Sequence, residues 1–296
     1  KRCLKEKVSI TAATVVGFLI AGTVAFGGEP TNVEFKTADN SGKSKVTVTI
    51  NNADTDIEGT TNSISVADYE KLTTGGELAG LLTIETVDGV TTFASAVNEE
   101  GEATLGTVKA TGTDKGLLTL IKTEKDYKSI ISELTIEASG NSPEKTATAM
   151  EAAEEGHTVT NAGTIAVKDY ALGMVAGAGA TAVNDKTITV NGTDAVGMSA
   201  ETDATKSTTT LTNDGKITVT KGIGISVKGD GKAEVAAGEI EVADAEGNIG
   251  INIADGTEKT TVTGAKITLA GAGKGINAEG NVTLKDIAIT LSEAAT

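Results

Sequence analysis

The chain has little of several residue types on which catalytic and disulfide-linked proteins depend. Its 296 residues include one cysteine, one histidine, one arginine, two prolines and no tryptophan, and aromatic residues make up 2%. The cysteine, Cys3, lies before the apolar run of a predicted leader, so the mature chain can form no internal disulfide. With one histidine and no mature cysteine, serine–histidine, cysteine–histidine and ordinary zinc sites cannot be assembled within one chain. Val, Ile, Leu and Ala must therefore form the core, in place of the large aromatics common in compact cores.

Positive charge is also scarce. The formal net charge is −16, and beyond residue 27 there are 21 lysines, no arginine and 40 acidic residues, which give −19. Phosphate affinity depends on clustered Lys and Arg, so nucleic acid is not expected as a partner. The acidity fits a protein that stays soluble outside the cell.

Residues 1–27 have the pattern of a signal peptide. A basic start precedes an apolar run centred on Val15–Ile20, and small residues follow, with Ala25 or Gly27 as the last residue before cleavage. A membrane-anchoring helix is the alternative, because the apolar stretch Val8–Phe26 is 19 residues long. Four Ser and Thr residues dilute that stretch and no basic stop-transfer cluster follows it, which favours secretion.

The second half contains a repeat of the form I-x-[VL], a gap, then G-[MI]-x-[AVI]. The Ile-to-Ile spacings are 23, 29, 23, 27 and 20. The copies are Ile165/Val167 with Gly173/Met174/Ala176, Ile188/Val190 with Gly197/Met198/Ala200, Ile217/Val219 with Gly224/Ile225/Val227, Ile240/Val242 with Gly250/Ile251/Ile253, Ile267/Leu269 with Gly275/Ile276/Ala278, and Ile287/Ile289, which opens a sixth.

A third apolar position precedes each copy by five or six residues: Val159, Val183, Leu211, Val235, Val262 and Val282. Each unit therefore holds three short period-2 segments, and the helical period of 3.6 is absent. Units that bury one face only by stacking on their neighbours form a solenoid. The sequence predicts an all-β, single-stranded parallel β-helix with three short strands per coil, one or two short inserted helices, and coils of about 20–29 residues over 158–296.

The register predicts several columns of equivalent side chains. Ile165, Ile188, Ile217, Ile240 and Ile267 should form one buried stack, and Asn161, Asn184 and Asn213 a hydrogen-bonded ladder at one corner. The glycine before Met or Ile is expected in a backbone conformation that a Cβ would strain. The outward residues Thr164, Thr187, Lys216, Glu239, Lys266 and Asp286 end in alternating charges, so this column cannot be a flat ice-binding threonine array.

The segment 28–157 is less regular. Ile64/Val66, Ile84/Thr86, Val108/Ala110 and Leu134/Ile136 have the spacing of degenerate coils, although Tyr127, Ile130, Ile131 and Leu134 also have helical spacing. Ser142 as N-cap, Pro143, an Ala/Glu-rich middle and Gly156 predict a helix at 143–155. The stretch 139–157 is then the longest insertion between coils, where recognition or simple covering of the solenoid is expected.

No catalytic, cofactor-binding or metal-binding residue is assigned, and the chain is not expected to be an enzyme. The lone His157 is expected to be a solvated turn residue. Asp54/Asp56 and Glu154/Glu155 are paired carboxylates only in the weak sense that glycoside hydrolysis uses two. The glycine-rich segment Gly271–Gly275 lacks the first glycine and the Ser/Thr of a phosphate loop.

The signal sequence and the N-x-G-x-I-x-V…G-[MI]-x-A coils resemble the passenger regions of autotransporters (type V secretion) of Gram-negative bacteria. The motif stands at Asn161–Val167 and Asn213–Val219, and the likeness covers residues 158–290 well and 30–157 poorly. The resemblance implies a surface adhesin held on the outer membrane through a C-terminal barrel that this chain does not include. It predicts a secreted, monomeric module that binds a cell-surface protein or glycan. A carbohydrate-active β-helix hydrolase or lyase and a purely structural stalk are the alternatives.

Overall fold

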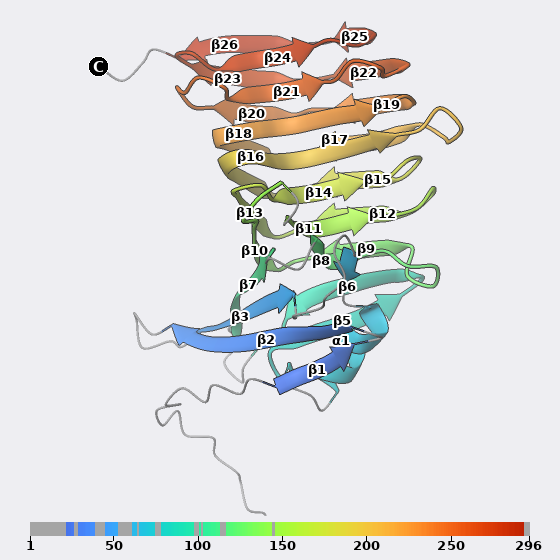
Figure 1. Cartoon of the computed structure of the whole chain (residues 1–296), viewed down its shortest axis with the longest axis vertical. Coiled ribbons are helices and arrows are strands. Elements are labelled where there is room, and N and C mark those ends of the chain that lie inside the picture. Colours follow the sequence, from blue (N-terminus) through green and yellow to red (C-terminus); the bar gives the residue numbers. More distant parts are fainter. Residues whose placement is uncertain are drawn as a thin grey trace, which may run out of the picture.

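The computed structural model describes residues 22–26, 29–38, 45–52, 61–63, 65–74, 78–97, 101, 103–112, 117–143 and 146–292. Strands dominate this part of the chain and wind into stacked coils (Figure 1). Most of the predicted leader, residues 1–21 and 27, lies outside the described residues, and Gly22–Phe26 forms strand β1. The expected fold class, a parallel β-solenoid, is confirmed.

Each coil runs through three faces, named here after the residues that mark them. The Ile face holds β7 (Leu105–Thr111), β10 (Thr135–Ser139), β13 (Thr164–Lys168), the first halves of β16 (Thr187–Thr202) and β18 (Lys216–Gly229), β20 (Glu239–Val242), β23 (Lys266–Ala270) and β26 (Ala288–Ser292). The Gly face holds β8 (Leu117–Lys122), β11 (Ala147–Ala152), β14 (Leu172–Ala176), the second halves of β16 and β18, β21 (Ile249–Ile253) and β24 (Lys274–Ala278). The Thr face holds β9 (Ser129–Ser132), β12 (Thr158–Asn161), β15 (Thr181–Asn184), β17 (Thr209–Asn213), β19 (Lys232–Ala236), β22 (Lys259–Thr263) and β25 (Val282–Lys285).

Successive strands on each face pair in parallel, and on the Ile face their register aligns the predicted isoleucines. Ile165, Ile188, Ile217, Ile240 and Ile267 lie opposite one another in turn, and each is at most 1% exposed. Ile136 extends the same column toward the N-terminus. The predicted buried stack is confirmed, and its side chains are removed from water only because coils lie above and below them.

The predicted alignment of the regular coils is wrong at three positions, one on the Ile face and two on the Thr face. In the last coil Ile267 lies opposite Ile289, so this coil reads Ile289/Leu291 instead of Ile287/Ile289. On the Thr face the inward partners of Val159 and Val262 are Ala182 and Leu284, which replace the predicted Val183 and Val282. An apolar residue one or two positions from the inward site led to each misalignment, because any small or apolar side chain can fill a thin core.

The repeated glycine is required for a different reason from the one expected. None of Gly173, Gly197, Gly224 and Gly250 has a positive φ. A Cβ on Gly224 would instead lie 2.6 Å from the carbonyl oxygen of Gly250 in the next coil and 3.3 Å from methyl groups of Val219 and Ile240. The glycine therefore allows neighbouring coils and the aliphatic core to approach closely at this corner.

The predicted asparagine ladder is present and buried. Asn161 Nδ2 donates to Asn184 Oδ1 at 2.7 Å, and Asn184 Nδ2 donates to Asn213 Oδ1 at 2.7 Å. Asn213 Nδ2 ends the ladder on the carbonyl oxygens of Ala237 and Glu239, at 2.8 and 3.1 Å. Except at this end, each side-chain amide thus donates to the amide oxygen of the asparagine in the next coil, so the corner between the Thr and Ile faces keeps its shape from coil to coil.

Charges on the outer side of the Ile face pair across coils, as the alternating column predicts in part. Lys216 Nζ lies 3.3 Å from Glu239 Oε1 and also contacts Glu241. Ala288, not Asp286, takes the last place in this column. Glu137 contributes a second ladder, with Lys109 and Lys168 at 3.1 and 2.8 Å. Burial would raise the pKa of Glu137, but hydrogen bonds from the two lysines outweigh it and hold this pKa below its usual range.

The N-terminal strands depart from the coil pattern. β1, β2 (Glu29–Ala38) and β3 (Lys45–Asn52) pair antiparallel in that order; β3 then pairs in parallel with β7, and β4 (Thr61–Ser63) with β8. β5 (Leu82–Val87) and β6 (Val90–Ser95) form an antiparallel hairpin, and β6 pairs in parallel with β9. The predicted coil at Ile84/Thr86 is wrong, since these residues lie in the hairpin's outer strand. Val108/Ala110 is confirmed as a coil strand, and its partner is Ile136/Ala138, so the predicted pair Leu134/Ile136 is shifted by two.

The helix lies at a different position from the ones predicted. The predicted helix at 143–155 is wrong, because Ala147–Ala152 form strand β11, in which Met150 lies opposite Met174 of the next coil. The helical spacing from Tyr127 to Leu134 is misleading too, since Ser129–Ser132 form β9. The one helix among the described residues is α1 (Val66–Thr73), which contains Val66 of the coil expected at Ile64/Val66; Ile64 lies outside the described residues. Its Tyr69 packs edge-on against Phe93 and donates to the carbonyl oxygen of Leu120 at 2.8 Å.

Candidate binding surfaces

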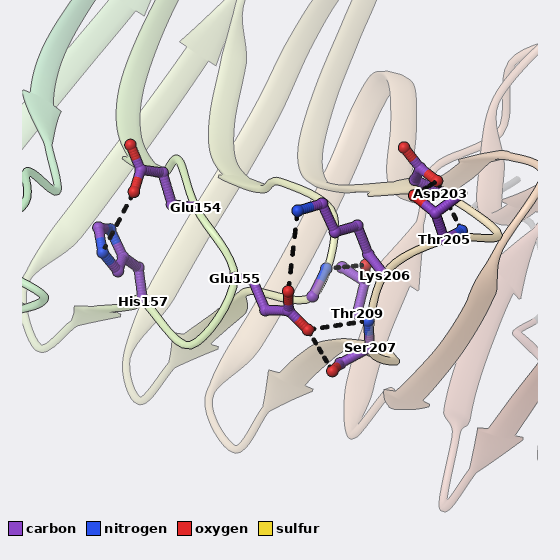
Figure 2. Close-up of polar contacts among 9 residues, drawn as sticks. Glu154, Glu155, His157, Asp203, Thr205, Lys206, Ser207 and Thr209 are labelled. Atoms are coloured by element: carbon purple, nitrogen blue, oxygen red, sulfur yellow. Dashed lines mark hydrogen bonds and ion pairs between the residues drawn. The ribbon is translucent and has the colours of Figure 1, made fainter.

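The corner between the Gly and Thr faces carries a cluster of polar side chains. The loop 203–208, between β16 and β17, reaches across one intervening coil to Glu155, as Figure 2 shows. Ser207 donates to Glu155 Oε1 through its backbone nitrogen, at 3.1 Å, and through its hydroxyl. Lys206 Nζ lies 3.8 Å from Glu155 Oε2. These contacts tie the corner that carries Glu155 to the corner two coils further along the solenoid.

The carboxylates of this corner accept hydrogen bonds that fix the shape of its loop. The hydrogen bonds from Ser207, with the charge of Lys206 in support, lower the pKa of Glu155, so its carboxylate stays ionised. Asp203 accepts hydrogen bonds from the backbone nitrogen and hydroxyl of Thr205, at 2.7 and 2.6 Å, and these lower its pKa in the same way. Both carboxylates are occupied by the loop's own donors, which shape the loop.

His157 is buried, contrary to the expectation of a solvated turn residue. It is 3% exposed, and its Nδ1 lies 2.9 Å from the hydroxyl of Thr123 in the preceding coil. Burial lowers its pKa, although the carboxylate of Glu154, 3.9 Å from Nε2, acts in the opposite direction. The imidazole is therefore neutral at neutral pH and serves as a packed hydrogen-bonding group between two corners.

The carboxylates considered for glycoside hydrolysis do not converge. Figure 2 shows Glu154 turned toward His157 and Glu155 turned toward the loop 203–208. Asp54 and Asp56 lie outside the described residues. The glycine-rich segment 271–275 spans the turn between β23 and β24 and the first two residues of β24, and the amide of Ala272 donates to Asp244 Oδ1 at 2.8 Å. A carboxylate of the preceding coil thus occupies an amide that a phosphate would need.

The described part of the chain holds a small internal cavity and no cluster of potential metal ligands. An apolar cavity near Tyr69 and Phe93 measures about 10 Å³, roughly one water-sized sphere. The described residues bring no three His, Cys, Asp or Glu side chains together as metal ligands. Among the same residues, no helix has the length and apolar character needed to cross a membrane.

The outer side of the Thr face carries a pattern that is not among the predicted columns. Each inward residue is flanked by two outward ones, and in three strands both are threonine: Thr158/Thr160, Thr210/Thr212 and Thr261/Thr263. The register places these residues in two parallel columns, interrupted by Val183 on β15 and by Glu234 and Ala236 on β19. The T-x-T triplet around the third apolar position is the signal that could reveal this surface.

A hollow of about 380 Å³ lies over β17, β19, β22 and β25, strands stacked side by side in the upper part of Figure 1. Thr210, Thr212, Thr261 and Thr263 line it together with Glu234, Val235, Ala236 and Lys285. The hollow forms because the short Ala236 stands between Thr212 and Thr263 in one column. Comparisons with family models, curated proteins and solved structures gave no match, so geometry alone defines the class of this protein as a β-solenoid.

Proposed function

We propose that this chain is a surface-displayed β-solenoid of the autotransporter-passenger type, acting as an adhesion module for a cell-surface protein or glycan. The observation that carries the proposal is the stacking itself. Buried columns continue in register from β10 to β23, while loop lengths at the corners differ between coils. Such a scaffold holds long outer surfaces rigidly and lets them vary in sequence without disturbing the core.

The leader-like pattern of residues 1–27 and the acidic composition support the same function. A signal peptide at this place would direct the chain across a membrane, and the formal charge of −19 beyond residue 27 favours solubility outside the cell. The solenoid needs no disulfide, because stacked strands and the asparagine ladder hold its coils together. The expected recognition site at 139–157 is not retained in this proposal, since β11 places much of that segment within a coil.

Adhesion is tested with beads that carry the folded chain, applied to epithelial and bacterial cells. We expect saturable attachment that the free chain competes away. Beads carrying the Ile217→Asp variant, whose stack is broken, serve as the control. Attachment no greater than that control refutes the adhesion proposal and leaves a structural stalk.

The same preparation separates adhesion from the carbohydrate-active alternative. We expect no release of reducing ends or unsaturated products from acidic and neutral polysaccharides. Turnover that disappears on Glu154→Gln or Asp54→Asn substitution, and not on substitution of exposed Glu279, contradicts the proposal in favour of an enzyme.

A further inference from the structure

We propose that the hollow on the Thr face is a binding site for neutral saccharides, an inference that rests on the proposed adhesive function and names its ligand class. The hollow lies over the outward residues of β17, β19 and β22, with Lys285 of β25 at its edge. It is a shallow depression, open to solvent, with a volume of about 380 Å³.

The polar groups of the hollow are free to bind a ligand. In the described part of the chain, no protein hydrogen bond engages the hydroxyls of Thr210, Thr212, Thr261 or Thr263. Glu234 and Lys285 are exposed and form no ion pair with another described residue. The hollow therefore presents four hydroxyls, one carboxylate and one ammonium group that no other described residue engages.

These groups match the chemistry of a sugar ring. A carboxylate can accept hydrogen bonds from two adjacent sugar hydroxyls, and threonine hydroxyls can both donate and accept. The threonine methyls and Ala236 supply small apolar contacts for the C–H faces of the ring. Glu234 and the chain's charge of −16 disfavour acidic sugars, so the ligand is a neutral one.

Other ligand classes fit this surface less well. An extended peptide could add to a sheet only at an unpaired edge, whereas β17, β19 and β22 are paired on both sides. Phosphate-rich ligands are opposed by the negative charge. An ice surface would need an unbroken threonine lattice, and Glu234 and Ala236 interrupt both columns at the centre of the hollow.

A single shallow site of this kind binds weakly, and display in many copies would raise the avidity. Saturation-transfer NMR therefore suits the first measurement, with galactose, N-acetylglucosamine, N-acetyllactosamine and sialylated N-acetyllactosamine as probes. We expect transfer to the neutral saccharides and at least a threefold weaker signal from the sialylated one.

Variants locate the site. Ala236→Ile fills the hollow and should abolish transfer, while Thr263→Val removes one hydroxyl without changing shape and should weaken binding about tenfold. Val183→Ile and Thr160→Val make comparable changes in the same column outside the hollow, and both should bind like the wild type. Circular dichroism verifies that all four variants remain folded.

The outcomes separate this inference from the adhesion proposal. Absence of transfer to every neutral saccharide, or equal loss in the hollow variants and their controls, overturns the saccharide site even if beads still adhere to cells. Thermal hysteresis without saccharide contact would also overturn it and would assign the threonines to ordered water. Saccharide binding confined to the hollow, with no adhesion of the beads, would refute adhesion and leave the site intact.

Discussion

Replacing Ile217 with aspartate places a carboxyl group in the middle of the buried isoleucine column. Ile217 is 0% exposed and lies opposite Ile188 on one side and Ile240 on the other. Removing a fully buried aliphatic side chain costs about 2–5 kcal/mol. An acid without a hydrogen-bond partner in its place adds about 1–3 kcal/mol. The sum is comparable with the whole unfolding free energy of many domains, roughly 5–15 kcal/mol.

Urea unfolding followed by far-UV circular dichroism measures the effect. We expect Ile217→Asp to lose most of its β signal in water, and Ile217→Val to lower the unfolding free energy by about 0.5–1.5 kcal/mol. Thr220→Asp is the control on the same strand, because Thr220 is exposed, and it should shift stability by less than about 0.5 kcal/mol. If Ile217→Asp and Thr220→Asp unfold at the same urea concentration, the column does not carry the stability attributed to it.

Three further substitutions test the corners. Asn184→Ala should destabilise the chain by about 1–3 kcal/mol, because it leaves the buried amides of its ladder neighbours unpaired. The control Asn191→Ala, at an exposed position, should leave stability unchanged, and equal urea midpoints for the two variants would argue against the ladder. Gly224→Ala should cost about 1–3 kcal/mol because its methyl group meets a carbonyl of the next coil, and an unchanged melt would mean that the coils separate easily there. Burial lowers the pKa of His157 in the folded chain. The contribution of the neutral imidazole to folding stability is therefore complete above about pH 6.5. It is lost as pH falls below that value, because the unfolded chain takes up the proton first. Between pH 7.5 and 5.5 the melting temperature of the wild type should therefore fall more than that of His157→Gln, and parallel profiles would contradict this. Glu137 and Glu155, whose pKa values are lowered, change stability only below about pH 4.5 and do not interfere with this comparison.

The regular coils are predictable because their buried inward positions require branched aliphatic side chains. A branched aliphatic residue at Ile165, Ile188, Ile217, Ile240 and Ile267 recurs with an intact motif, and a buried asparagine marks one corner in three coils. Position within the motif is less certain where the core accepts several residues. Ala182 fills the place expected for Val183, and only pairing with the neighbouring strand reveals the shift.

The helix error at 143–155 shows local propensity overridden by packing. Ala147, Ala149, Met150 and Ala152 are buried to 0% exposure in β11, and Ala149 stands where later coils have glycine, which hides the motif. Alanine favours an isolated helix, but in this position its small side chain suits the thin core equally well. His157 is buried for a related reason, since the corner that carries it packs on Thr123 of another coil.

The hollow on the Thr face could be anticipated only in part. The T-x-T triplets are visible in the sequence, but the alignment of Thr212, Ala236 and Thr263 in one column depends on a register between strands 24 and 27 residues apart. Corner loops of different lengths separate those strands, so spacing alone does not determine the register. The tie between Glu155 and Ser207, 52 residues apart, is likewise invisible before the coils are stacked.

Disulfide trapping between coils tests the register on which every column, the ladder and the hollow depend. Thr189 and Thr218 are register partners on the outer side of the Ile face, whereas Thr189 and Glu241 lie two strands apart, roughly 9–10 Å. In a chain with Cys3→Ser, cysteines at 189 and 218 should form an intramolecular disulfide under mild oxidation, because the spacing suits the bond, and cysteines at 189 and 241 should not. Efficient trapping of the second pair, or failure of the first in a folded chain, would contradict the parallel solenoid register.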